Sequence, residues 1–136
     1  MNDRDLIRLA LGARENAYCM YSGVAVGAAL LCEGERVYLG SNIENAAFSP
    51  TVCAERVAFS TAVHAGKRDF SAIAVVGGKA SEPISAYTPP CGVCRQVLSE
   101  FCAPDFPVIL FDGTNTKILT LSALLPVSFG KADLQP

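Results

Sequence analysis

Two short cysteine segments, far apart in the chain, place the strongest constraint on how this sequence can fold. They read C-A-E-R at 53–56 and P-C-G-V-C-R at 90–95. Both are predicted to lie at the start of a helix, the first capped by Thr51 and running from about 52 to 64, the second running from about 91 to 101. A helix N-terminus lowers the pKa of a nearby thiol and favours the thiolate, the form that binds metal. A fold that brings these two helix starts together would assemble three sulfur ligands.

Three thiols and one carboxylate in these segments suit a catalytic zinc site. Cys53, Cys91 and Cys94 can supply three ligands, and catalytic zinc sites commonly keep their fourth position open. Glu55 beside that position can move protons. The other candidate ligands are Cys19, Cys32, Cys102 and His64. The last two lie about three turns along their helices, and a free cysteine is usually a small buried hydrophobe, so we expect an open position.

Three thiolates on Zn²⁺ leave a net negative cluster, which weakens the metal as a Lewis acid. A nearby cation would offset this effect. Arg56, directly after Glu55, and Arg95, directly after Cys94, are the candidates. An arginine hydrogen bond to a ligand sulfur would draw off charge. We therefore predict that one of these arginines contacts the cluster.

Charge and hydropathy limit the possible partners. The net charge is −2 and the isoelectric point is near 5.3, which argues against a nucleic-acid partner. The apolar runs are shorter than the ~20 residues that span a bilayer, and the N-terminus lacks the apolar core of a signal peptide. The six cysteines of this core-rich chain are better interpreted as free thiols and metal ligands than as disulfides. We expect a cytoplasmic protein without membrane contact.

Helical and strand patterns alternate along the rest of the chain. A first helix is predicted from Asp3, as its cap, to about Tyr18. Strands are predicted at 24–32, 36–40, 70–77, 107–111 and 117–120, with a short helix at 121–125 and a frayed tail after Phe129. The first two strands are joined by a hairpin-type turn. This alternation predicts one layered α/β domain over residues 1–136, with the sheet covered on both faces.

Six stretches of the sequence match the motifs of a known family. They are Y-S at 21–22, V-G-A-A-L at 26–30, G-S-N-I-E-N-A-A-F-S at 40–49, C-A-E-R at 53–56, P-C-G-V-C-R-Q-V-L-S-E at 90–100 and L-L-P at 124–126. On these motifs the chain resembles the small homotetrameric, zinc-dependent cytidine deaminases. The resemblance implies a three-layer α/β/α fold with a mixed, roughly five-stranded sheet. It also implies deamination of cytidine and 2′-deoxycytidine in pyrimidine salvage.

The resemblance also assigns roles to individual residues. It implies zinc on Cys53, Cys91 and Cys94, Glu55 as the proton shuttle, Arg56 as the charge-compensating arginine, Asn42 and Glu44 on the ribose 3′-hydroxyl, a backbone contact from Ala54 to the pyrimidine, and Phe129 reaching a neighbouring subunit's site. Asn42 and Glu44 are two apart in an extended segment, so they project to one side. A hydroxyl that both donates and accepts would satisfy this amide and carboxylate together.

The sequence departs from the family pattern at three positions. The family often has Pro where Met20 stands, Phe where Val24 stands and Tyr where Phe48 stands. An aromatic side chain at position 24 would pack on the pyrimidine ring, and valine offers less surface. The departures therefore leave room for a relaxed or altered substrate.

Other functions remain compatible with the same cysteines. A structural zinc module would not need Glu55, and a thioredoxin-like redox site would not need Cys53. Deaminases of base-containing antibiotics, of the blasticidin type, share C-A-E and P-C-x-x-C-R-Q, although the N-I-E-N-A-A segment favours a nucleoside. A single-stranded nucleic-acid editor is disfavoured by the acidic balance and the lack of interleaved basic and aromatic residues.

Overall fold

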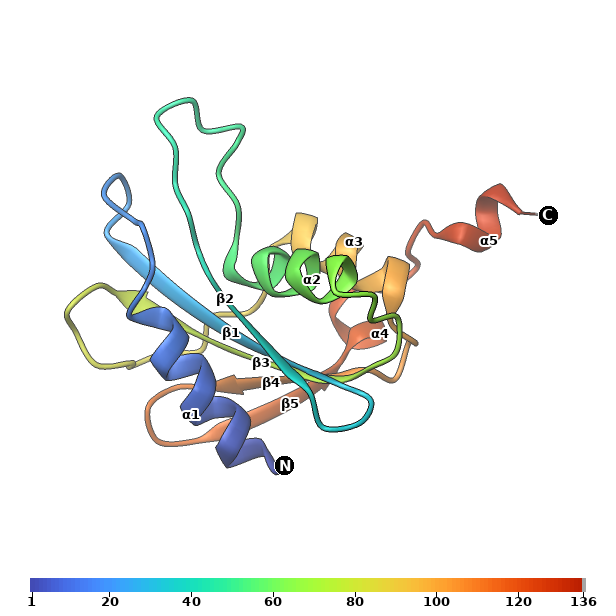
Figure 1. Cartoon of the computed structure of the whole chain (residues 1–136), viewed down its shortest axis with the longest axis horizontal. Coiled ribbons are helices and arrows are strands. Elements are labelled where there is room, and N and C mark those ends of the chain that lie inside the picture. Colours follow the sequence, from blue (N-terminus) through green and yellow to red (C-terminus); the bar gives the residue numbers. More distant parts are fainter. Residues whose placement is uncertain (136) are drawn as a thin grey trace.

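A mixed sheet of five strands forms the middle layer of residues 1–135, the part of the chain that the computed structural model describes (Figure 1). The strands are β1 (Val24–Cys32), β2 (Val37–Ser41), β3 (Phe70–Lys79), β4 (Pro107–Phe111) and β5 (Thr116–Thr120), in the spatial order β2-β1-β3-β4-β5. β1 is antiparallel to β2 and β3, β3 is parallel to β4, and β4 is antiparallel to β5. The predicted mixed sheet and its opening antiparallel pair are confirmed.

Helices cover both faces of this sheet, as the sequence predicts. α1 (Asp3–Arg14) packs on one face, whereas α2 (Ala54–His64), α3 (Gly92–Phe101) and the short α4 (Leu121–Leu124) lie on the other (Figure 1). β3 supplies alternate residues to the two cores: Ile73 and Val75 face the α2 side, and Val76 faces α1. This period of two explains why the central strands are apolar without interruption.

Two glycines allow helix backbones to lie directly on the sheet. A Cβ atom at Gly27 would lie 2.0 Å from the carbonyl oxygen of Ala10 in α1. A Cβ atom at Gly40 would lie 2.1 Å from the carbonyl oxygen of Ala54, in the first turn of α2. Real Cβ atoms do not approach so closely, so both positions require glycine. Gly40 therefore fixes how near the start of α2 lies to β2.

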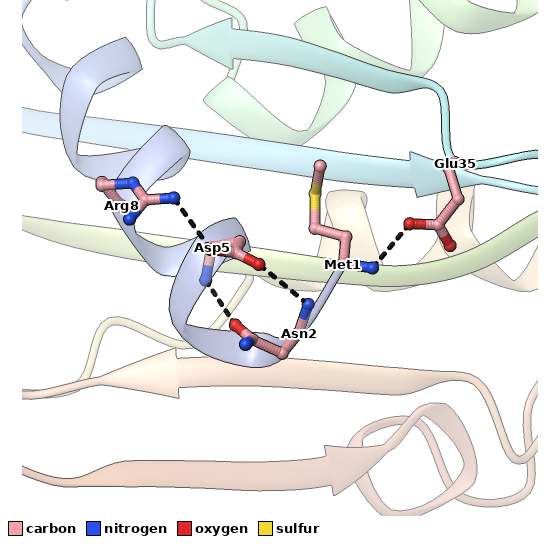
Figure 2. A network of polar contacts seen from close by, with 5 residues as sticks. All are labelled: Met1, Asn2, Asp5, Arg8 and Glu35. Atoms are coloured by element: carbon pink, nitrogen blue, oxygen red, sulfur yellow. Dashed lines mark hydrogen bonds and ion pairs between the residues drawn. The ribbon is translucent and has the colours of Figure 1, made fainter.

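The N-terminus of α1 is closed by a reciprocal pair of hydrogen bonds (Figure 2). The Asn2 side chain accepts from the Asp5 N–H at 2.9 Å, and the Asp5 carboxylate accepts from the Asn2 N–H at 3.1 Å. Arg8 donates to Asp5 at 2.8 Å, and the Met1 ammonium lies 2.6 Å from the Glu35 carboxylate. The cap is thus Asn2, and the expectation of Asp3 is wrong by one residue.

Most strand and helix ends lie within two residues of the prediction, and three helical segments need correction. α1 ends at Arg14 and does not reach Tyr18, because Tyr18 forms a bridge to Ile43 and donates its N–H to the Asn42 carbonyl at 2.9 Å. α2 begins at Ala54, because Val52 is held extended by a bridge to Ile43. The tail forms a further short helix, α5 (Lys131–Leu134), where fraying is predicted. Within residues 1–135, none of the helices is long and apolar enough to cross a membrane.

Candidate active site

Three cysteine side chains meet where α2 and α3 begin. Cys53 is the N-cap residue of α2, Cys91 is the N-cap residue of α3, and Cys94 lies one turn into α3. The Sγ atoms of Cys53 and Cys91 are 3.7 Å apart, those of Cys91 and Cys94 are 3.6 Å apart, and all three lie within 4.8 Å of one another. Tetrahedral Zn–S bonds of about 2.3 Å place sulfurs about 3.8 Å apart. The donor set and its spacing therefore fit zinc.

Local backbone structure explains this convergence. Both N-cap cysteines have extended backbone angles, with φ and ψ of −76° and 155° at Cys53 and −68° and 168° at Cys91. The segment before Cys91 contains Pro89 and Pro90, which favour an extended entry into the helix. Cys91 and Cys94 are three residues apart, so their thiols share one side of the helix start. Two helix N-termini therefore direct their positive ends at the same sulfurs.

Arg56 and Cys94 stabilise negative charge on Cys53. A hydrogen bond from the Cys94 thiol, together with one from Arg56, lowers the pKa of Cys53 to about 5. The Arg56 Nη2 atom lies 3.5 Å from the Cys53 sulfur. The pKa of Cys94 is raised, because its thiol donates to Cys53 and is buried. The neighbours of Cys53 thus favour its thiolate form, which is the form that binds metal.

The second candidate arginine lies elsewhere. Arg95 donates from Nε to the carbonyl of Pro90 and from Nη1 to the carbonyl of Leu124, at 2.7 Å each. Its neighbour in sequence, Cys94, faces the cluster, and a one-residue step along a helix turns the next side chain away. Of the two arginines, Arg56 is the one that the structure places on a cluster sulfur.

The other thiols and the histidine do not join the cluster. In the described chain, the convergent group of metal-type ligands consists of Cys53, Cys91 and Cys94. Cys32 is buried in the apolar core beneath α2, and Cys102 packs against that core. Burial raises the pKa of both thiols, to about 12 for Cys102, so they remain protonated. A metal held by the three thiols would therefore keep a fourth position for a non-protein ligand.

Glu55 is a buried carboxyl group beside the cysteines. It lies in the first turn of α2, and only 4% of its surface is exposed. Burial raises its pKa to about 7, and the negative charge of Cys53 acts in the same direction. A carboxyl group that titrates near neutral pH can both accept and release a proton during a reaction.

A cavity of about 230 Å³ opens in front of Glu55 and Cys91. Its apolar lining includes Val24, Val26 and Val52. Ser22 and Thr88 also line it, and the sequence patterns do not assign them a role. Thr88 donates its hydroxyl to the carbonyl of Gly77 at 2.9 Å, which ties the loop before α3 to β3. The sequence signal that could have pointed to Thr88 is its place directly before Pro89, Pro90 and Cys91.

The Asn42 side chain lines the cavity and forms two hydrogen bonds with the backbone of β1. Its Oδ1 atom accepts from the Val26 N–H, and its Nδ2 atom donates to the Val24 carbonyl, each at 2.8 Å. The side-chain amide therefore continues the pairing of β2 with β1. One N–H of the amide remains free to donate into the cavity.

Glu44 lines the same cavity and anchors the loop before β1. Its Oε1 atom accepts from the N–H groups of Tyr21 and Ser22 at 3.0 Å, and Oε2 accepts from the Ser22 hydroxyl. These bonds, with the Ser22 hydroxyl first, hold the pKa of Glu44 below its usual range. A carboxylate oxygen accepts about two hydrogen bonds, so one acceptor position remains on Oε2.

Ala54 and Phe129 lie in different surroundings. Ala54 is fully buried, lines the cavity and occupies the first turn of α2, where backbone N–H groups lack intrahelical partners. Phe129 is 60% exposed and lines a separate cavity beside Gln96, whose Nε2 atom donates to the Phe129 carbonyl at 2.9 Å. The structure therefore brings Ala54 to the cysteine cluster and does not bring Phe129 to the cavity of its own chain.

The sequence and the fold are both similar to those of proteins from one family. A family model described as the cytidine and deoxycytidylate deaminase zinc-binding region matches residues 1–110. The cytidine deaminase of Sporosarcina psychrophila is 49% identical over 138 residues, covering 98% of this chain and 96% of that protein. That of Halalkalibacterium halodurans is 44% identical over 135 residues, covering 98% of each. A crystal structure of cytidine deaminase from Burkholderia pseudomallei matches with a TM-score of 0.87 at 40% identity, covering 95% of this chain and 100% of that one.

Proposed function

Because the chain belongs to the cytidine and deoxycytidylate deaminase family, we propose that it is a hydrolase that deaminates cytidine and 2′-deoxycytidine. Water replaces the exocyclic amino group, and ammonia, uridine and 2′-deoxyuridine are released for pyrimidine salvage. The observation that carries this proposal is the convergence of three thiols beside the buried Glu55, whose pKa is about 7. The whole chain, residues 1–136, serves as one deaminase domain.

Glu55 carries the protons of this reaction. Zinc bound to Cys53, Cys91 and Cys94 supplies Lewis acidity, which makes water a nucleophile near neutral pH. Glu55 takes a proton from the attacking water and delivers it to ring N3, which makes C4 electrophilic. The water oxygen forms its bond to C4. Glu55 then takes the second proton from this new hydroxyl and passes it to the amino group, and the C4–N bond breaks to release ammonia and leave the C4 carbonyl. A group whose pKa is near 7 suits both transfers.

Arg56 adjusts the charge of the site. Three thiolates and a divalent cation sum to a net charge of −1, and Arg56 brings a positive charge to the Cys53 sulfur at 3.5 Å. A hydrogen bond to a ligand sulfur withdraws electron density from it. Arg56 thereby preserves the Lewis acidity that three thiolates would otherwise diminish.

Asn42 and Glu44 recognise one ribose hydroxyl. After their contacts within the chain, Asn42 retains one N–H donor and Glu44 retains one acceptor position. A hydroxyl that donates to Glu44 and accepts from Asn42 completes both side chains. This match supports the assignment of the pair to the ribose 3′-hydroxyl.

The base lies between Ala54 and an aliphatic wall. The N–H of Ala54 can donate to the pyrimidine, because the first turn of a helix leaves such groups free. Val24 is 40% exposed and lines the cavity, so it offers the ring a contact smaller than an aromatic side chain would. We expect weaker base binding than at a site with phenylalanine there.

Phe129 acts in a neighbouring subunit of a homotetramer. Phe129 and Phe48 are 60% and 75% exposed, and such large apolar side chains are usually covered in an assembly. The exposed Phe129 lies near the C-terminal end of the chain, where it can reach another copy.

The six free cysteines of the described chain are typical of a reducing compartment, which supports a cytoplasmic location.

A substrate panel tests this function. The purified protein, with zinc content measured, is incubated with cytidine, 2′-deoxycytidine, 3′-deoxycytidine and cytosine, while ultraviolet absorbance and ammonia are followed. Cytidine and 2′-deoxycytidine should be deaminated. The 3′-deoxy analogue and cytosine should lose about a hundredfold or more in kcat/KM, because the donor and acceptor of Asn42 and Glu44 are left unpaired.

Two results would contradict the proposal in different ways. Equal rates with 2′- and 3′-deoxycytidine would remove the hydroxyl assignment and leave the reaction intact. No turnover of either natural nucleoside at one zinc per chain would exclude the deaminase function proposed here. Blasticidin S and zinc exchange would then distinguish an antibiotic deaminase from a structural zinc module.

A further inference from the structure

Arg95 joins the approach to the cysteine cluster to the C-terminal part of the chain. Its Nε atom donates to the carbonyl of Pro90 and its Nη1 atom to the carbonyl of Leu124, both at 2.7 Å. Pro90 is fully buried and directly precedes Cys91, and Leu124 is the last residue of α4. One guanidinium therefore connects two segments that are distant in sequence.

Each of these bonds satisfies a carbonyl that secondary structure leaves without a partner. Pro90 lies outside any strand or helix, and the last carbonyls of a helix such as α4 lack intrahelical donors. The Cys91 thiol makes no cap hydrogen bond within residues 1–135, and its side chain is exposed. Besides the contacts of its sulfur with Cys53 and Cys94, Cys91 is held by the buried Pro90 beside it and by the Cys91–Arg95 backbone bond of 2.9 Å.

We propose that Arg95 is a positioning residue for zinc, acting through Pro90 on the ligand Cys91. Its effect comes from two directed hydrogen bonds and not from its charge. A guanidinium presents several donors in a fixed plane and can serve two carbonyls at once, whereas a lysine ammonium is a point charge on a flexible stem. The adjacent Gln96 holds the carbonyl of Phe129, so α3 connects the metal site to the C-terminal segment at two points.

Zinc release tests this role without any substrate. Zinc-loaded wild type, Arg95→Lys and Arg95→Met are mixed with an excess of a chromogenic chelator, and the release rate is recorded. Residues that orient metal ligands typically change metal affinity 10–100-fold, so both variants should release zinc at least about tenfold faster. Arg68→Lys is the matched control, because Arg68 also donates to two carbonyls, those of Val63 and Lys67, away from the cluster. Its release rate should equal that of wild type.

The cobalt-substituted proteins give a second readout. Thiolate-to-cobalt absorption should shift or weaken in both Arg95 variants and stay unchanged in Arg68→Lys, because cobalt reports the ligand geometry directly. A wild-type release rate in Arg95→Lys, with a fast rate in Arg95→Met, would show that charge suffices and would overturn the proposal. Unchanged rates in both variants would overturn it as well.

Hydrogen exchange of the wild-type chain keeps the proposal testable if the Arg95 variants do not fold. Zinc loading should slow exchange of the Leu125 amide, which bonds to Leu121 in α4, more than that of amides in α1. Equal changes in the two helices would contradict the coupling. The inference rests on the zinc site of the proposed function and not on its substrate, so a protein that binds zinc and fails to deaminate cytidine leaves it standing.

Discussion

Adding one methyl group at Gly40 tests whether the sheet positions the catalytic end of α2. The Cβ atom of Gly40→Ala would lie 2.1 Å from the carbonyl oxygen of Ala54 and 2.7 Å from the N atom of Ala58. Opening the shorter contact to the 3.4 Å of ordinary packing requires a displacement of about 1.3 Å. Ala54 lies between Cys53 and Glu55, so this displacement acts on the metal ligand and the proton carrier.

A displacement of this size should reduce the catalytic rate strongly and the free energy of unfolding only moderately. Misplacing reacting groups by about 1 Å can reduce the rate about a hundredfold, and overpacking of this kind typically costs about 1–3 kcal/mol. A shift of β2 would not relieve the effect, because Asn42 follows that strand into the same cavity. We therefore expect Gly40→Ala to fold with reduced stability and to lose about a hundredfold in kcat/KM for cytidine at equal zinc content.

Gly27→Ala is the matched control. Its Cβ atom would lie 2.0 Å from the carbonyl oxygen of Ala10, so the clash is as severe but is directed at α1 on the other face of the sheet. Thermal unfolding should show similar losses of stability for the two variants. Activity per folded molecule should fall strongly only for Gly40→Ala. A kcat/KM for Gly40→Ala within about threefold of that of Gly27→Ala would refute the reasoning.

Three further predictions concern stability and the metal. Asn2→Ala removes the N-cap of α1, which costs about 1 kcal/mol of folding free energy. Calorimetry should show a Tm lower by about 3 °C, with kcat unchanged. An unchanged Tm would show that the cap contributes nothing. Removing zinc with a chelator should lower Tm by about 10 °C or more, because the metal joins the starts of two helices; equal Tm values with and without zinc would be inconsistent with this. In the metal-free protein, the pKa of Glu55 rises from 4.5 to about 7 on folding, so the folded state binds the proton more tightly and stability falls as pH rises through this range. Metal-free Glu55→Gln should lack this loss and exceed metal-free wild type at pH 8 by on the order of 3 kcal/mol in denaturant unfolding; identical pH profiles would count against the buried carboxyl.

Sequence patterns predict the elements of this fold more readily than their contacts. The β-branched run at β3 and the apolar run at β1 identify the central strands, because buried strands need such residues on both faces. The helix starts at Cys53 and Cys91 are predicted to within two residues. Local competition decides the remaining differences. Val52 forms a bridge to Ile43 and stays out of α2, and adjacent residues compete to cap α1.

Contacts between distant segments explain what the sequence does not reveal about the site. Arg56 and Arg95 are equivalent candidates by their places beside the cysteines, and the family resemblance favours Arg56. Only the fold places the carbonyl of Leu124 beside Arg95. The raised pKa of Glu55 depends on how completely α2 covers it. The hydrogen bond from the Ser22 hydroxyl to the Glu44 carboxylate likewise forms only when the loop before β1 meets the segment after β2. Such properties depend on tertiary packing, which local patterns do not specify.

Deamination by zinc-loaded Glu55→Gln tests the central claim most directly. The variant keeps the size of the side chain and the three cysteine ligands, so it should retain one zinc per chain. Cytidine absorbance and ammonia release should show a loss of turnover of about 10²–10⁴-fold relative to wild type, the usual contribution of a general acid–base group. A zinc-loaded Glu55→Gln protein that retained most of the wild-type rate would contradict the account, because the proton transfers would then not depend on this carboxyl group.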